Sequence, residues 1–211
     1  ARLADMVLTT PRCVTLFSQG VNQSSAGTDK VNAILNLEIA LGRVGRPGAG
    51  PFSLTGQPNA MGGREVGGLA NQLAAHLGFS DAERRLVGEF WQATDMATGP
   101  GLKAVELIDA LGAGKIGALW IIGTNPAVSL PDAGRFRRAL ARCPLVVVSD
   151  CVTGTDTQAL AHVLLPAAGW SEKDGTVTNS ERRISRQRAV LPPPGDARPD
   201  WWLIAEVARR L

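Results

Sequence analysis

The stretch Gly117-Ala-Leu-Trp-Ile-Ile-Gly123 is apolar throughout and is bounded by glycine at both ends. A short, continuous apolar run of this kind is typical of a strand that is buried on both faces. Pro144-Leu-Val-Val-Val-Ser149 is a second such run, and Val163-Leu-Leu165 is a third. An amphipathic helical pattern at residues 102–111 precedes the first run, and another at residues 131–141 lies between the first run and the second. Apolar strands that alternate with helices predict a parallel sheet that helices cover on both sides.

The N-terminal part repeats this pattern once. Cys13-Val-Thr-Leu-Phe17 reads as a short buried strand, and a polar, Gly-containing turn follows it. A helix is expected from Asp29 to about Leu41, with Gly42 as its stop. Apolar side chains lie nearly all around this helix, so we expect it to be largely buried. A strand, a polar loop and a helix make half of a parallel α/β unit.

Residues 43–68 are rich in glycine and proline and keep no helical or strand periodicity. A loop of this length inside a compact domain is usually functional or disordered, and its apolar residues favour a functional loop. Helices are expected at residues 69–77 and 81–91. The fold class predicted for the chain is therefore α/β: a doubly wound, mostly parallel, Rossmann-like sheet with helices on both faces and a long Gly/Pro-rich functional loop at 43–68.

We expect a single α/β region over residues 1–211. Within it, residues 1–95 hold a strand, helices and the long loop, and residues 96–190 hold the parallel strand/helix units. Residues 191–211 form an extended Pro-rich linker and a terminal helix, which is predicted from Asp200 onward.

Composition excludes several classes of function. The formal net charge of +3 is too small to suggest nucleic acid as a partner. No apolar run is long enough to span a membrane, so no membrane partner is expected. The three cysteines, Cys13, Cys143 and Cys151, are far apart and form no Cys-x-x-Cys motif, so no cysteine metal framework is expected. Their odd number favours a reducing, cytoplasmic location, and Cys13 and Cys143 are expected to be buried.

Polar residues follow each predicted strand, where ligands of open parallel sheets collect. These positions are residues 18–23, Thr124-Asn-Pro126, Ser149-Asp150 and the stretch from Ala168 through Ser180. The polar stretch 171–185 cannot bury itself as an apolar strand or helix, so it must lie on the surface or line a ligand site. A carboxylate directly after a strand suits nucleotide donors, and a lysine suits a pyrophosphate. The pattern points to a dinucleotide-type ligand, although no Gly-x-Gly-x-x-Gly motif follows the first strand.

Several long motifs, in order, carry a family resemblance. They are Gly-Val-Asn-Gln (20–23), Asn-Leu-Glu-Ile-Ala-Leu-Gly-Arg-Val-Gly-Arg-Pro-Gly (36–48), the segment at 51–67, Gly-Thr-Asn-Pro (123–126), Val-Val-Val-Ser-Asp (146–150) and Ala-Leu-Ala-His-Val-Leu-Leu-Pro-Ala-Ala (159–168). The Glu-Lys-Asp-Gly loop, at residues 172–175, extends the match. Together these motifs resemble a molybdopterin oxidoreductase of the nitrate reductase branch, with the assimilatory type the most similar. The Ser-Leu-Thr-Gly-Gln-Pro segment favours nitrate reductase over formate dehydrogenase.

The resemblance implies a bis-molybdopterin guanine dinucleotide cofactor that holds molybdenum, and nitrate as the anionic substrate. The positions that match the family's cofactor contacts are Gln19, Gln23, Asn125, Ser149, Asp150, Lys173 and Asp200. Arg64 matches an arginine near the substrate funnel, and Met61 and Gln57 are further candidates near it.

The departures from the family pattern limit these expectations. The cysteines that bind an iron–sulfur cluster and the cysteine that ligates molybdenum have no counterparts here, so no metal ligand is assigned and the cluster is expected outside this chain. The chain thus looks like an internal piece of a larger enzyme whose other domains are its partners, and alone it is expected to be inactive. Alternative readings are formate dehydrogenase or another oxo-transfer branch, or a cofactor-free scaffold domain of the same fold.

Overall fold

The computed structural model describes residues 2–210, and the chain divides into two compact units. The first unit comprises residues 1–60 and the second comprises residues 61–211. Each unit is described by itself.

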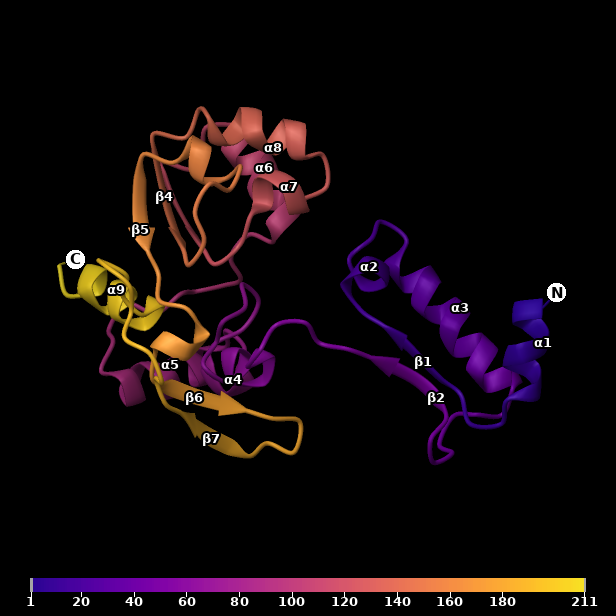
Figure 1. The fold of residues 1–211 in the computed structure, drawn as a ribbon. Coiled ribbons are helices and arrows are strands. Elements are labelled where there is room, and N and C mark those ends of the chain that lie inside the picture. Colours follow the sequence, from indigo (N-terminus) through magenta and orange to yellow (C-terminus); the bar gives the residue numbers. More distant parts are fainter. Residues whose placement is uncertain (1, 211) are drawn as a thin grey trace. The chain divides into compact units, whose positions relative to one another are not determined.

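The first unit is built around two parallel strands. Its elements are α1 (Arg2–Thr9), β1 (Val14–Phe17), α2 (Gln19–Asn22), α3 (Gly27–Ala40) and β2 (Gly50–Ser53). Strands β1 and β2 pair in parallel, with Val14 opposite Gly50 and Phe17 opposite Ser53. Helix α3 connects the two strands and contacts β2, as Figure 1 shows. The strand and the helix expected at the N-terminus are present. The strand is not buried as expected, because Val14 and Leu16 are exposed, and the polar segment after it contains the short helix α2.

Helix α3 is not largely buried, contrary to expectation. Only Gly27 and Glu38 are buried, whereas Leu37 and Ile39 are exposed. A sheet of two strands is too narrow to cover more than one side of a helix, so apolar residues on its other sides remain open in this unit. Cys13 is likewise only partly buried, while Cys143 in the second unit is buried as expected.

The Gly/Pro-rich segment at 43–68 is not structureless. It contains strand β2 and helix α4 (Ala60–Glu65), which the sequence pattern did not predict. Strand β2 carries glycine and proline, which lower intrinsic strand propensity, but pairing with β1 supplies the hydrogen bonds that fix it. The expected helix at 69–77 is also wrong, because only a single turn forms at Ala74–His76. Ala75 and His76 both have positive φ, which interrupts a regular helix.

The second unit contains a parallel sheet of the order β3-β4-β5. Its elements up to the end of this sheet are α4, a 3-10 turn (Ala74–His76), α5 (Asp81–Trp91), α6 (Ala104–Gly112), β3 (Ala118–Ile122), α7 (Pro126–Ser129), α8 (Ala133–Leu140), β4 (Leu145–Asp150), a 3-10 turn (Gln158–Leu160) and β5 (Val163–Pro166). All three predicted strands are present. The α/β class with parallel strands and flanking helices is confirmed, although the parallel strands form two small sheets.

Apolar burial between this sheet and two helices holds the second unit together. Helices α6 and α8 contact each other, and α7 contacts α8. The core contains Ile108, Phe136, Leu140, Val146 and Val148, each no more than 3% exposed. Burying an aliphatic or aromatic side chain of this size contributes about 1.5–3 kcal/mol. This core fixes the edge of the sheet at which the candidate site lies.

The rest of the unit is an antiparallel hairpin and a terminal helix. Its elements are a 3-10 turn (Trp170–Glu172), β6 (Gly175–Thr178), β7 (Ile184–Gln187) and α9 (Asp200–Ala208). The polar stretch 171–185 was expected to lie on the surface or to line a ligand site, and it forms most of this hairpin, which the sequence pattern did not predict (Figure 1). Its side chains are largely exposed, so the strands satisfy each other's backbone groups without burying polar side chains.

Candidate functional site

The carboxyl ends of β3, β4 and β5 lie at one edge of the three-stranded sheet. Ile122 pairs with Ser149, and Asp150 pairs with Pro166. Gly123, which has a positive φ of 62°, turns the chain out of β3 toward Asn125. The structure therefore brings Asn125, Asp150 and the segment after Pro166 to the same edge, as parallel pairing requires.

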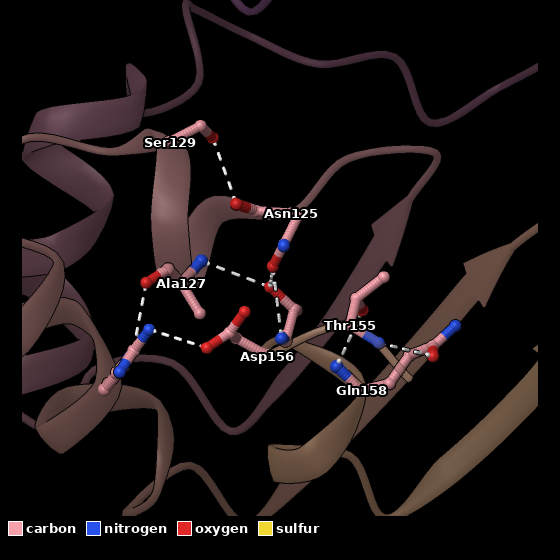
Figure 2. Close-up of polar contacts among 8 residues, drawn as sticks. Asn125, Ala127, Ser129, Thr155, Asp156 and Gln158 are labelled. Atoms are coloured by element: carbon pink, nitrogen blue, oxygen red, sulfur yellow. Dashed lines mark hydrogen bonds and ion pairs between the residues drawn. The ribbon is translucent and has the colours of Figure 1, made fainter. Parts of the chain in front are cut away.

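Asn125 is held by a network that reaches across to the loop before β5. Its side-chain Oδ1 accepts hydrogen bonds from the hydroxyl of Thr157 at 2.6 Å and from the Thr157 backbone N–H at 3.2 Å. The Thr157 hydroxyl in turn accepts the backbone N–H of Ala127 at 3.1 Å. Figure 2 shows these contacts, together with the Ser129 hydroxyl that donates to the backbone carbonyl of Asn125. The Nδ2 amide of Asn125 donates to none of the described residues.

Asp150 lies on a cavity at the end of β4. Its Oδ1 accepts the backbone N–H of Val152 at 3.2 Å, a contact that shapes the start of the following loop. Its Oδ2 has no hydrogen-bond partner among residues 2–210. The cavity has a volume of about 330 Å³, and its lining includes Asp150, Gly154, Gln158 and Pro194. Asp150 is half-buried, and one of its carboxylate oxygens is thus without a protein partner at this cavity.

Ser149 has a structural environment. The residue is fully buried, and its hydroxyl accepts a hydrogen bond from the indole N–H of Trp120 at 2.7 Å. The Trp120 side chain belongs to the neighbouring strand β3, so this bond ties two strands together. No surface of Ser149 is open to a ligand in this structure, and of the predicted residues it offers a ligand the least.

Lys173 and Asp200, which are far apart in sequence, form an ion pair with a distance of 2.9 Å between Nζ and Oδ2. Their side chains are 25% and 31% exposed. A parallel bridge between Ala167 and Arg198 places the segment before α9 beside the end of β5. The pair Lys173–Asp200 therefore joins the segment that follows β5 to the start of α9.

In the first unit, Gln19 begins α2 directly after β1. Its Nε2 donates to Oε1 of Gln57 at 2.8 Å, and the neighbouring Ser18 hydroxyl donates to the backbone carbonyl of Leu54 at 2.8 Å. These contacts hold the carboxyl ends of β1 and β2 together. Gln57, one of the further candidates, therefore touches a predicted cofactor contact. Gln23 ends α2 and has an exposed side chain.

Arg64 lies in α4 of the second unit with an exposed side chain. Its guanidinium makes no hydrogen bond or ion pair with any described residue, whereas its backbone carbonyl accepts a bond from Gln72. The next residue, Glu65, is fixed by the Thr178 hydroxyl at 3.1 Å and by Arg182 at 3.2 Å. The hairpin thus anchors the helix that presents the free guanidinium of Arg64.

A family model described as Molybdopterin oxidoreductase matches residues 12–210, which is almost the whole chain. The chain belongs to the molybdopterin oxidoreductase family. The prediction made from the sequence motifs is therefore confirmed.

Relatives within this family differ in name. The nitrate reductase of Klebsiella oxytoca is 60% identical over 201 residues, which cover 95% of this chain and 23% of that protein. The nitrate reductase of Shewanella frigidimarina is 56% identical over 206 residues, which cover 98% of this chain and 22% of that protein. A formate dehydrogenase subunit alpha of Methanocaldococcus jannaschii is 40% identical over 200 residues, covering 95% and 29%. This molybdopterin oxidoreductase chain thus spans less than a third of the length of each relative.

Residues 2–210 contain neither a cluster of metal-binding side chains nor a helix that could span a membrane. No group of three or more His, Cys, Asp or Glu side chains in that range is placed to hold a metal ion. Among the same residues, no helix is both long enough and apolar enough to cross a membrane.

Sequence reasoning missed two residues that organise this molybdopterin oxidoreductase site. Thr157 was not singled out, yet it is fully buried and binds Asn125. Glu65 was not singled out, although it joins α4 to the hairpin. Their partners lie 32 residues or more away in the chain, so no local pattern indicates either contact.

Proposed function

We propose that this chain holds the guanine nucleotide end of a bis-molybdopterin guanine dinucleotide cofactor in a molybdenum-dependent nitrate reductase. The observation that carries the proposal is the sheet edge that brings together Asn125 and Asp150, with the pair Lys173–Asp200 on the segments that follow β5. In open parallel sheets this edge is where nucleotide ligands bind. Family membership supports a pterin cofactor of this kind.

The chemistry of the residues fits a guanine nucleotide. Guanine offers N–H donors, and Asp150, whose Oδ2 has no hydrogen-bond partner among residues 2–210, lines a cavity large enough for part of a small ligand. Asn125 contributes amide donors, and Lys173 contributes a cation for phosphate oxygens. When bound, the molybdenum cofactor supplies oxygen-atom transfer coupled to two-electron reduction. The role proposed for these residues is to hold and orient its nucleotide tail.

Lys173 and Asp200 fit this role only with a change of partner. They now neutralise each other at 2.9 Å. An anionic phosphate can share or replace the Asp200 carboxylate as the partner of Lys173, and a guanine donor can do the same toward Asp200. Because both side chains are partly exposed, the exchange does not leave a buried charge unpaired.

The names of the two most identical relatives reported above favour nitrate as the substrate. Arg64 supports an anionic substrate, since its guanidinium is exposed and unpaired among the described residues. We propose that Arg64 attracts nitrate on its way to the metal. Partners of the chain are then the remaining domains of the parent enzyme. On its own the chain is expected to lack nitrate turnover, because it corresponds to only 22–23% of those relatives.

A cytoplasmic location is part of this proposal. The three cysteines are free thiols, and two of them, Cys13 and Cys151, reach the surface at least partly. Free accessible thiols persist in reducing compartments.

Turnover by the full-length parent enzyme tests the substrate. Purified enzyme should reduce nitrate with a reduced viologen as electron donor and should not oxidise formate with the oxidised dye. Formate oxidation without nitrate reduction would replace this proposal with the formate dehydrogenase alternative, which the 40% identical relative supports. A purified enzyme that contains no molybdenum and no pterin would favour the cofactor-free scaffold.

A substitution tests the nucleotide site. Asp150→Ala in the full-length enzyme removes hydrogen bonds to a charged group, which are worth about 1.5–3 kcal/mol each. Release of the guanine dinucleotide cofactor from the folded enzyme should therefore accelerate about tenfold or more. Asp95→Ala, which alters an exposed aspartate away from the sheet edge, is the matched control and should leave release unchanged. Equal release by wild type and Asp150→Ala would remove Asp150 from the site.

A further inference from the structure

The hydrogen bonds around Asn125 have only one possible direction. The backbone N–H groups of Ala127 and Thr157 can only donate. The Ala127 N–H occupies the Thr157 hydroxyl as an acceptor, and the Thr157 N–H needs an acceptor on Asn125. The atom of Asn125 that faces Thr157 must therefore be the oxygen, and the hydroxyl proton of Thr157 points to the same oxygen at 2.6 Å.

This direction fixes the opposite end of the side chain. With Oδ1 turned toward Thr157, the NH2 group of Asn125 is the end that remains without a protein partner among residues 2–210. Both of its protons are available to a ligand. An asparagine that is free to flip offers either a donor or an acceptor, but here only a donor is presented.

We propose that Thr157 is a positioning residue, which holds Asn125 so that this position recognises hydrogen-bond acceptors of the cofactor only. The inference rests on the nucleotide-binding role proposed above and makes it more specific. Phosphate oxygens, ribose oxygens and the O6 or N7 atoms of guanine are acceptors that fit. Guanine N1–H and N2–H are excluded at Asn125 and are left to a carboxylate such as Asp150.

The buried part of the network does the positioning. Thr157 has no exposed surface, so water cannot replace its bonds to Asn125. Arg137 strengthens the frame from outside, donating to the Ala127 carbonyl at 3.0 Å and to Asp156 at 2.8 Å. The ion pair between Arg137 and Asp156 is about half exposed, so it contributes less than the buried contacts. Figure 2 shows how Asp156 and Ala127 flank the contact between the two loops.

The test uses the full-length parent enzyme and measures how fast the guanine dinucleotide cofactor appears in the filtrate of the folded protein, where hydrolysis of the filtrate liberates guanine nucleotide for its assay. Thr157→Val has nearly the same volume but has no hydroxyl, so Asn125 loses its strongest restraint. Release should accelerate about two- to tenfold, the effect of losing the hydrogen bond that the hydroxyl donates to Asn125. The Ala127 N–H also loses its acceptor in this variant. Thr157→Ser restores the hydroxyl and should restore the wild-type rate. Thr155→Val, whose hydroxyl bonds Gln158 and not Asn125, is the matched control.

Asn125→Asp tests the direction of recognition. The aspartate can still accept both bonds from Thr157, but it replaces the free NH2 with a carboxylate oxygen. Release should accelerate more than in Thr157→Val, because an acceptor of the nucleotide then meets a negative charge. Wild-type retention in Asn125→Asp would overturn the assignment of an acceptor.

The outcomes separate this inference from the proposed function. If Asp150→Ala accelerates release while Thr157→Val does not, or if Thr157→Ser behaves like Thr157→Val, the positioning role is wrong and the nucleotide site stands. If the wild-type enzyme contains no guanine nucleotide, both proposals fall. The expected pattern is rapid release in Asp150→Ala, Asn125→Asp and Thr157→Val, with retention in Thr157→Ser and Thr155→Val.

Discussion

Replacing Arg43 with methionine should destabilise the first unit selectively. Arg43 is 3% exposed and lies 3.9 Å from Glu38, measured between Nη1 and Oε2, and Glu38 is fully buried. The Thr15 hydroxyl donates to the other Glu38 oxygen, and Arg43 donates to the backbone carbonyls of Val7 and Thr10. Methionine keeps much of the apolar stem of Arg43 but removes its charge and its hydrogen-bond donors to Val7 and Thr10.

The expected loss is comparable with the whole stability of the unit. Removing one partner of a buried ion pair costs about 3–5 kcal/mol, because the other charge stays buried without compensation. A unit of 60 residues has a free energy of unfolding of only about 3–9 kcal/mol at typical values per residue. No other hydrogen bond in the described chain can replace the lost contact, since Oε2 of Glu38 and Nη1 of Arg43 already lack hydrogen-bond partners there. Arg43→Met should therefore leave the first unit largely unfolded or close to it.

The distribution of tryptophan gives a built-in control for the assay. All tryptophans lie in the second unit: Trp91, Trp120, Trp170, Trp201 and Trp202. In urea titrations of the 211-residue chain, tryptophan fluorescence should report an unchanged midpoint for the second unit. Far-ultraviolet circular dichroism and hydrogen exchange of α3 amides should report the loss in the first unit.

Two further variants complete this test. Arg46→Met changes an exposed arginine three positions away and should have little effect. The double variant Glu38→Leu with Arg43→Met removes both charges and should be less destabilised than Arg43→Met alone. A shift below about 1 kcal/mol for Arg43→Met would refute the buried-charge argument, since that is the range of exposed pairs.

Three other perturbations follow from local contacts. A hydrogen bond from Ser80 is the main cause that lowers the pKa of Glu83. The ionised Glu83 therefore stabilises α5 above the ordinary value of 4.5, and this stabilisation is lost as the pH falls through the lowered pKa. Hydrogen exchange of α5 should become faster on acidification in wild type, and this change should be smaller in Glu83→Gln. Glu65→Gln should accelerate exchange in the β6–β7 hairpin, at a cost of about 0.5–1.5 kcal/mol per weakened bond, and unchanged protection there would contradict the anchoring role. Cys151 is exposed and should react rapidly with a thiol reagent, whereas the buried Cys143 should react only on unfolding; mass spectrometry of labelled peptides distinguishes them.

The apolar runs made the second unit predictable. Strands β3, β4 and β5 were expected from uninterrupted apolar residues, and the structure has all three within a residue or two. Helix α5 was predicted at its observed limits, and the structure shows that Ser80 and Glu83 form a capping box at its start. Local chemistry decides both features, so sequence alone is sufficient for them.

The errors lie where distant contacts override local pattern. Strand β2 has glycine and proline where a strand usually has β-branched residues, and it exists because β1 pairs with it. The hairpin of β6 and β7 is polar on its exposed faces, so the rule that strands alternate or are apolar gave no signal. In both cases the hydrogen bonds between strands stabilise a conformation that the side chains alone do not indicate.

In the candidate site, the position of the polar residues could be predicted from the strand ends, but the availability of their polar atoms depends on tertiary contacts. Parallel pairing made it possible to expect Asn125, Ser149 and Asp150 at one sheet edge, but not to rank them. Ser149 precedes Asp150 directly, yet its hydroxyl is committed to Trp120 and buried, whereas Asp150 keeps one oxygen free. For Asn125 the free end is decided by Thr157, 32 residues later in the chain. Which polar atom is available to a ligand, and therefore whether a donor or an acceptor is recognised, is thus a property of the fold and not of the motif.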